Sequence, residues 1–267
     1  MKEVEEIEGA RGYDTTALRH TGYRNRIHRD YLAHVFRWGF ASRYVNETST
    51  GARRVLEAGC GADAQLYETF IKPRGPDQKP EFYVGVDLNK IPVNGRRRLG
   101  TQAQETFILK EQFNFVERWQ ELLNEYGATF DLAISFEVIE HMEEAHGDEY
   151  LRGIHALLAP TGRLMLSTPV FNGHAAANHI KEYTVQELQT KLEKANFVVD
   201  ERFGTFGSYP QIKKGLREKY SEQNSTELIE MYDNLRKFYS DDVLACFLSP
   251  VLPDHARNNV WMLSKRK

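Results

Sequence analysis

The stretch "VLEAGCGAD", Val55 to Asp63, carries the strongest structural signal in the chain. An apolar run reaches the acidic Glu57, and two glycines two positions apart, Gly59 and Gly61, follow at once. Glycine accepts a positive φ and lets backbone N–H groups approach a ligand closely at the start of a helix. The stretch therefore predicts a buried strand, a ligand-binding turn and a following helix. A carboxylate beside that turn favours a cationic ligand group over a phosphate.

The same alternation of short apolar and longer amphipathic segments continues from residue 52 onward. It is typical of βαβ units, in which helices cover both faces of a mostly parallel sheet. The expected strands are 53–58, 82–87, 106–110, 130–136, 162–169, 197–203 and 259–264. The expected helices are 63–71, 115–126, 144–158 and one that opens with a capping box at Thr184 and Glu187. The predicted fold class is α/β, a doubly wound, seven-stranded, mostly parallel sheet.

Two helical regions stand outside this alternation. Residues 1–50 combine a charged tail with an apolar stripe at helical spacing, which predicts a cap helix. Residues 207–255 are polar and helix-rich, and they precede the last expected strand. We therefore expect a core of residues 51–206 plus 256–267, with 207–255 as a helical insertion or lid.

Composition sets further bounds. The 267 residues, 41% of them hydrophobic, suit one α/β domain with an elaboration. No run approaches the ~18 apolar residues that span a bilayer, and the first residues, MKEVEEIEGA, do not resemble a secretory signal. The two cysteines, Cys60 and Cys246, cannot form a disulfide framework. We expect a cytoplasmic protein without membrane contact, and the net charge of −3 supplies no overall attraction for nucleic acid.

The second expected strand ends in Asp87. At this position of a doubly wound fold a carboxylate can accept both hydroxyls of a ribose, although an aspartate there can also serve only as a turn or cap residue. Gly59, Gly61 and Ala64 match the G-x-G-x-x-A pattern of dinucleotide-binding folds, which leaves a nicotinamide-dependent oxidoreductase as an alternative. Glu57 argues against it, because a carboxylate there would repel a pyrophosphate.

Four motifs in order resemble those of class I S-adenosylmethionine-dependent methyltransferases. They are EAGCG at 57–61, VGVDL at 84–88, FDLAISFEVIEHM at 130–142 and GRLMLSTP at 162–169. The resemblance covers about residues 52–205 and the final strand. It implies a Rossmann-like methyltransferase fold with an antiparallel last strand, and S-adenosylmethionine bound across the carboxyl ends of the first strands. One departure is Asp63, where many members have glycine.

The resemblance also implies a set of cofactor-binding residues at the ends of the first four strands. They are Glu57, Ala58, Gly59, Gly61, Asp87, Leu88, Gln112, Phe113, Ser135 and Phe136. The stretch 57–61 would surround the methionine part, Asp87 would hold the ribose and Leu88 would face the adenine. Gln112 and Phe113 would read the adenine amino group, and the last two would line the transferable methyl group.

Acidic and imidazole side chains follow the fourth strand. A helix beginning there would place Glu137, Glu140 and His141 on one side, and the loop after the fifth strand brings His174 and His179 toward the same rim. Such groups can hold a general base or a hard divalent cation, or they can serve only structure. We predict His141 and Glu137 as the catalytic residues and assign no metal ligands.

The E-x-x-E-H sequence and the later histidine resemble two branches of the superfamily, the ubiquinone-biosynthesis O-methyltransferases and the small-RNA 2′-O-methyltransferases. The latter hold a metal with such residues. We predict methyl transfer from S-adenosylmethionine to O or N of a small-molecule acceptor. A metal-dependent RNA 2′-O-methyltransferase using Glu137, Glu140, His141 and His179 is the first alternative, and nucleic acid is the less favoured partner. A catalytically silent protein that retains the fold is a further alternative, and no pattern indicates an oligomeric state.

Overall fold

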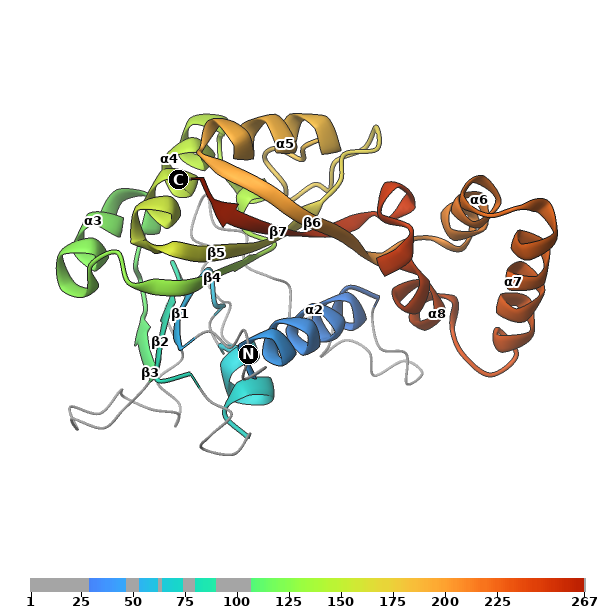
Figure 1. Ribbon diagram of the computed structural model, residues 1–267, viewed down its shortest axis with the longest axis horizontal. Helices are drawn as coiled ribbons and strands as arrows, with labels where there is room; N and C mark the ends of the chain where they lie inside the picture. The colour runs from blue at the N-terminus through green and yellow to red at the C-terminus, as the bar shows by residue number, and fades with distance from the viewer. Residues whose placement is uncertain (1–28, 47–52, 62–63, 74–79, 90–106, 267) are drawn as a thin grey trace, which may run out of the picture.

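The computed structural model describes residues 29–46, 53–61, 64–73, 80–89 and 107–266 (Figure 1). Within these ranges, the side chains of residues 29–31 are left undescribed. Asp63, the position that departs from the methyltransferase motif, lies outside the described residues.

A seven-stranded sheet with the order β3-β2-β1-β4-β5-β7-β6 forms the centre of the molecule. The strands are β1 (Arg54–Ala58), β2 (Phe82–Val86), β3 (Phe107–Lys110), β4 (Phe130–Phe136), β5 (Leu158–Pro169), β6 (Phe197–Phe206) and β7 (Asn258–Lys265). Strands β1 to β5 pair in parallel, whereas β7 is antiparallel to both β5 and β6. The predicted α/β fold class and the antiparallel last strand are confirmed.

Helices cover both faces of this sheet (Figure 1). The helices α3 (Phe115–Tyr126), α4 (Glu144–Leu157) and α5 (Val185–Lys194) pack on one face, and α2 (Arg29–Asn46) lies on the other. In α3 the buried residues Phe115, Trp119 and Leu122 recur at helical spacing and form one apolar stripe. The helix expected at 63–71 is the π-helix η1 (Leu66–Ile71), in which Lys72 N donates to Tyr67 O at 2.8 Å.

The alternation of β1 decides which face each of its side chains reaches. Leu56 and Ala58 pack into the core under α3 and α4, while Val55 packs into the core on the α2 side. Glu57 shares the α2-side direction with Val55 because residues two apart in a strand point to the same face. The acid at the centre of the first motif is therefore buried, with 4% of its surface exposed.

Three helices lie between β6 and β7, at the right of Figure 1. They are α6 (Tyr209–Lys219), α7 (Glu222–Leu235) and α8 (Asp241–Leu248), followed by the short 3-10 turns η4 (Ser249–Val251) and η5 (Pro253–His255). They share an apolar cluster of their own that includes Ile212, Leu216 and Tyr232. Because β6 runs parallel to β1 through β5, this helical segment leaves the sheet at the carboxyl edge. In the described part of the chain, no helix has the length and apolarity needed to cross a membrane.

Candidate active site

The turn after β1 is bent by two left-handed glycines. Gly59 has φ +85° and Gly61 has φ +72°, and Gly59 N and Cys60 N both donate to Val86 O, at 2.8 and 3.1 Å. A Cβ on Gly59 would lie 2.4 Å from Val138 Cγ2, so this glycine is needed for packing. A Cβ on Gly61 would meet no atom of the described residues within 4 Å. The open side of the turn is therefore at Gly61.

Asp87 lies directly beside that turn. Its Oδ2 accepts from Gly61 N at 2.7 Å, and its Oδ1 accepts from the backbone and side-chain nitrogens of Asn89, both at 2.8 Å. The adjacent Leu88 keeps 47% of its surface exposed. The sequence analysis assigned Glu57, Gly61 and Asp87 to one cofactor, and the structure brings these three residues together. We call them the cofactor edge.

Glu57 is the buried acid of the cofactor edge. Its Oε2 accepts a 2.5 Å hydrogen bond from the Tyr83 hydroxyl. Burial raises the pKa of the Glu57 carboxyl to about 8, the hydrogen bond from Tyr83 opposes this rise, and the negative charge of Asp87 adds to it. A cationic group beside this carboxyl would favour its ionised form. The chemistry of Glu57 therefore fits a ligand that carries a sulfonium and an ammonium.

Gln112 and Phe113 belong to the turn between β3 and α3. Gln112 N donates to Asn89 O at 3.2 Å and Phe113 N donates to Asp87 O at 2.8 Å, so this turn is tied to the end of β2. Gln112 is exposed and has φ +48°, whereas Phe113 is buried in the core. Contact of these two residues with an adenine stays a prediction. Of the two side chains, only the exposed Gln112 is accessible to a ligand.

Ser135 and Phe136 end β4 and are both buried. The Tyr150 hydroxyl from α4 lies 2.7 Å from Ser135 Oγ and 3.0 Å from Ala58 O. Tyr150 thereby joins the carboxyl end of β1 to that of β4. This contact fixes the spacing between the cofactor edge and the segment that follows β4.

Glu137 does not lie on a helix with Glu140 and His141. It adopts a left-handed conformation with φ +56°, and the 3-10 turn η3 (Ile139–His141) begins two residues later. The helix considered from residue 137 does not form, because the left-handed residue turns the chain before the 3-10 turn begins. The Glu137 carboxylate accepts from Ser167 Oγ at 2.9 Å and from Asn258 Nδ2 at 2.8 Å.

A buried arginine completes the surroundings of Glu137. Arg37 of α2 is 1% exposed, and its guanidinium lies 3.3 Å from Glu137 Oε1. The carboxylate of Glu137 thus contacts donors from α2, β5 and β7. Arg37 and Asn258 were not identified from the sequence.

Glu140 is fully buried. Its Oε2 accepts from Thr168 Oγ1 at 3.0 Å, while its Oε1 has no hydrogen-bond partner among the described residues. Burial raises the pKa of Glu140 well above its ordinary value, and the charge of Glu137 adds to the rise. The backbone O of Glu140 also accepts from Ile180 N and Lys181 N, at 2.8 and 3.0 Å. This bond pair holds the loop after β5 against η3.

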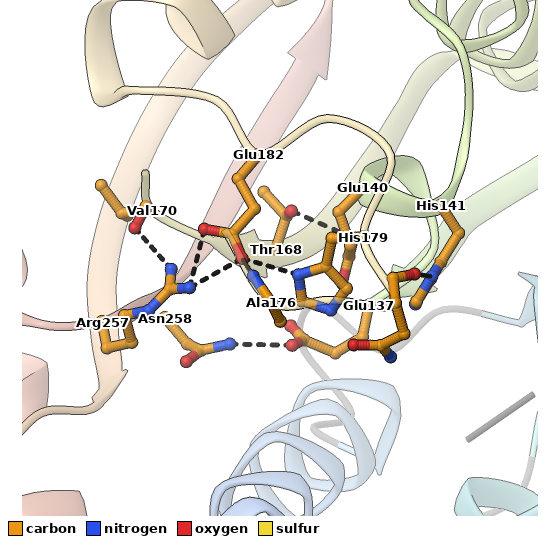
Figure 2. Close-up of polar contacts among 11 residues, drawn as sticks. Glu137, Glu140, His141, Thr168, Val170, Ala176, His179, Glu182, Arg257 and Asn258 are labelled. Carbon is orange, nitrogen blue, oxygen red and sulfur yellow. Dashed lines mark hydrogen bonds and ion pairs between the residues drawn. The ribbon is translucent and has the colours of Figure 1, made fainter. Parts of the chain in front are cut away.

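His141 and His179 meet in front of Glu140 (Figure 2). Their ring centroids are 4.9 Å apart and the ring planes are nearly perpendicular, at 85°. His141 Nδ1 lies 3.0 Å from Asn178 O and His179 Nδ1 lies 2.7 Å from Glu182 Oε1. Both partners accept hydrogen bonds, so Nδ1 of each ring carries a proton, and in a neutral ring Nε2 keeps its lone pair.

One ligand atom from each of Glu140, His141 and His179 lies within 4.8 Å of the other two. We call these three residues the histidine cluster. Glu137 is not part of this group, and His174, on the same loop as His179, is exposed. Burial lowers the pKa of His141, and the neighbouring His179 contributes to this, although the Asn178 carbonyl opposes it. The unpartnered Glu140 Oε1 and the two imidazole nitrogens form a donor set that fits a divalent cation.

Glu182 and Arg257 lie beside the cluster, next to His179 (Figure 2). Glu182 Oε1 also accepts from Ala176 N at 3.0 Å, and both of its oxygens accept from Arg257 at 2.7 Å. Burial alone would raise the pKa of Glu182, but Arg257, Ala176 N–H and His179 together hold it below its ordinary value. The sequence analysis missed both residues. The spacing of His179 and Glu182, three positions apart, was the only local signal for Glu182, and the sequence near Arg257 gave none.

Comparisons with known proteins identify the family and the fold. A family model described as "Methyltransferase domain" matches residues 23–202. The S-adenosylmethionine-dependent methyltransferase of Archaeoglobus fulgidus has a similar structure, with a TM-score of 0.53 and 17% identity over 94% of this chain and 100% of that one. No curated protein matches the chain in sequence.

Two further structures are similar at the level of the fold. The 1,6-didemethyltoxoflavin-N1-methyltransferase of Burkholderia thailandensis has a TM-score of 0.50 and 18% identity, over 92% of this chain and 93% of that one. Its structure contains 1,6-didemethyltoxoflavin and S-adenosylhomocysteine. The methyltransferase domain of bacterial CtHen1-CN has a TM-score of 0.50 and 16% identity, over 87% of this chain and 99% of that one.

Proposed function

The chain belongs to the class I S-adenosylmethionine-dependent methyltransferases, and from this premise we propose that it methylates an oxygen or nitrogen atom of a small-molecule acceptor held at the histidine cluster. The family assignment removes the nicotinamide-dependent oxidoreductase that the G-x-G-x-x-A pattern left open. The observation that supports the acceptor site is the meeting of two imidazole rings, with centroids 4.9 Å apart, in the segments that follow β4 and β5.

The cofactor edge would hold S-adenosylmethionine. Asp87 would accept the ribose hydroxyls, Glu57 would face the positively charged methionine part, and the open side of Gly61 would admit the ligand backbone. S-adenosylmethionine supplies a methyl group that its sulfonium already activates. The protein therefore needs mainly to position the acceptor and to remove its proton.

His141 is the residue proposed to receive that proton. Its Nδ1–H donates to the Asn178 carbonyl, which orients the ring and leaves Nε2 as the proton acceptor. Glu137, the second predicted catalytic residue, is proposed to act by position and charge, because its carboxylate is already held by Ser167, Asn258 and Arg37. Helix α2 and residues 207–255 are proposed to enclose the acceptor as a lid.

Calorimetry with S-adenosylhomocysteine and with NAD tests the cofactor, and we expect binding of the first alone. Transfer of labelled methyl groups from S-adenosylmethionine to a panel of phenols, alcohols and amines tests the acceptor. Label in one of these products supports the proposal. Binding of S-adenosylhomocysteine without transfer to any acceptor would favour a catalytically silent protein.

A second candidate function, metal-dependent RNA 2′-O-methylation, is supported by one specific observation. Glu140 Oε1 is buried and has no hydrogen-bond partner in the described part of the chain, and it belongs to a group whose ligand atoms lie within 4.8 Å of one another. Glu140, His141 and His179 would hold the ion, which would supply a Lewis acid beside the acceptor hydroxyl. Transfer to RNA that a chelator abolishes and Mn²⁺ or Mg²⁺ restores would favour this candidate over the first.

A further inference from the structure

A line of contacts runs from the start of β7 to the histidine cluster. Arg257 donates to both carboxylate oxygens of Glu182 at 2.7 Å, and Glu182 Oε1 lies 2.7 Å from His179 Nδ1 (Figure 2). The Glu182 side chain is fully buried, while that of His179 is 13% exposed. The Arg257 side chain is 21% exposed, so the line places one buried carboxylate between two partly accessible side chains.

Arg257 is itself held by the backbone of two strands. Its N–H donates to Phe206 O at the end of β6 at 2.6 Å, and its carbonyl accepts from Val170 N, just after β5, at 2.7 Å. Its guanidinium also donates to Val170 O. Arg257 is thus fixed where the chain returns from the helices α6 to α8 to the sheet. Its hydrogen bonds in turn hold the Glu182 carboxylate in position.

The chemistry of the contact dictates the state of His179. A carboxylate that accepts from Arg257 and from Ala176 N can only accept from the imidazole as well, so the proton of the neutral ring must reside on Nδ1. The same bond prevents the ring from turning over. His141 reaches the equivalent state through a weaker partner, the backbone carbonyl of Asn178.

We propose that Glu182 and Arg257 are positioning residues of the active site, which hold His179 in the Nδ1–H tautomer with Nε2 presented to His141 and Glu140. This inference rests on the proposed function in one respect, that the histidine cluster is where the acceptor binds. An ion pair that merely fastens the loop 170–184 to the sheet would stabilise the protein without selecting a tautomer.

The tautomer can be observed without any acceptor. In protein labelled with ¹⁵N-histidine, two-bond ¹H–¹⁵N correlation spectra distinguish Nδ1–H from Nε2–H rings, and His179→Gln assigns the signal. We expect Nδ1–H for His179 in the wild-type protein and a mixture of tautomers in Glu182→Ala. Glu182→Gln keeps an amide oxygen for Nδ1–H and Ala176 N–H, so it should keep most of the Nδ1–H state.

Glu187→Ala is the matched control. Glu187 is a nearby glutamate that accepts from Thr184 N at 2.7 Å and pairs with Lys181, away from the cluster. We expect its removal to leave the His179 tautomer and turnover unchanged. Should Glu182→Ala fail to fold, the wild-type spectrum still decides the inference, because an Nε2–H ring at His179 would overturn it.

Turnover provides the second readout. Removing a side chain that orients a site histidine typically costs about 10- to 100-fold in activity. We expect kcat of Glu182→Ala to fall by about this factor while KM for S-adenosylmethionine stays within about twofold, with Glu182→Gln recovering much of the loss. Unchanged kcat and tautomer in Glu182→Ala would overturn the inference. A wild-type protein with the expected tautomer but no methyl transfer would support the inference and count against the proposed function.

Discussion

The cofactor edge and the histidine cluster satisfy their polar groups in different ways. At the cofactor edge, Asp87 accepts from Gly61 N and from Asn89, a neighbour in sequence, so the ends of two adjacent strands hold each other. In the histidine cluster, Glu140 Oε1 has no partner among the residues that the structure describes, and each imidazole uses Nδ1 for its hydrogen bond. The carboxylate of Asp87 is already paired within its own turn, whereas the cluster keeps acceptor atoms that a ligand could engage.

The two regions also draw on different parts of the chain. The cofactor edge uses residues between 57 and 89, whereas the contacts of Glu137 and of the histidine cluster come from α2, β5, the loop 170–184 and residues 257 and 258. A local motif is therefore enough to specify where the cofactor binds. The chemistry at the acceptor depends on contacts that form only when distant segments have folded together.

The largest expected effect is a loss of kcat without a loss of cofactor affinity, which distinguishes the histidine cluster from the cofactor edge. His141→Ala removes the proposed proton acceptor and should lower kcat by about 10²- to 10⁴-fold, the usual contribution of a general base. The affinity for S-adenosylhomocysteine, measured by calorimetry, should stay within about twofold. His174→Ala, an exposed histidine on the loop that carries His179, is the control and should match the wild type. Equal losses of turnover and cofactor affinity would place His141 at the cofactor instead.

The next effect concerns the buried acids, which occur in both regions. The pKa of Glu57 is raised from 4.5 to about 8 in the fold, so between these values the folded protein holds a proton that the unfolded chain has lost. The free energy of unfolding should therefore fall as the pH rises through this window, by a few kcal/mol at ~1.4 kcal/mol per pKa unit. The raised pKa of Glu140 acts in the same direction.

Urea unfolding of the wild type and of Glu57→Gln across this pH range measures the effect. Glu57→Gln should flatten the dependence by the share that Glu57 contributes and leave the remainder to Glu140. A dependence that is unaltered in Glu57→Gln would show that the cofactor edge contributes none of it.

Features that depend on local sequence were predicted well. The strand expected at 130–136 is β4 with the same bounds, and the capping box at Thr184 forms both of its hydrogen bonds, at 2.7 and 3.2 Å. Asp87, expected at the end of the second strand, directly follows β2 and lies beside the glycine turn, where it accepts from Gly61 N. Each of these features is determined by residues within one element or by adjacent parallel strand ends.

Features that depend on tertiary contacts were not predictable. The left-handed conformation of Glu137 is stabilised by Ser167 and Asn258, which lie 30 and 121 positions away in the chain. Likewise, Arg257 lies 75 positions from Glu182 and follows a long helical segment. No periodicity in the sequence could report that these residues meet, since their pairing is decided by the order of β5, β7 and β6 in the sheet.

A smaller effect is expected at the cofactor edge alone. Asp87→Ala should weaken S-adenosylhomocysteine binding by about 1 to 3 kcal/mol, because it removes charge-assisted hydrogen bonds to the ribose. Asp131→Ala is a matched control, since Asp131 accepts from the backbone N–H groups of Arg53 and Arg54 at the opposite edge of the sheet. Its cofactor affinity should equal that of the wild type. Unchanged affinity in Asp87→Ala would mean that other residues hold the ribose.

The smallest effect tests whether the two regions are mechanically joined. Gly59 and Gly61 both have positive φ, so alanine at either should cost about 1 kcal/mol in the free energy of unfolding. At Gly59 the new Cβ would also lie 2.4 Å from Val138 Cγ2, and Val138 directly precedes η3 with Glu140 and His141. Gly59→Ala should therefore cost about 1 to 2 kcal/mol more than Gly61→Ala in urea unfolding. This additional loss comes from the contact between residue 59 and Val138, so Val138→Ala in the Gly59→Ala background should recover part of the free energy of unfolding. If the effects of the two substitutions on that free energy were strictly additive, the turn and η3 would be independent of each other.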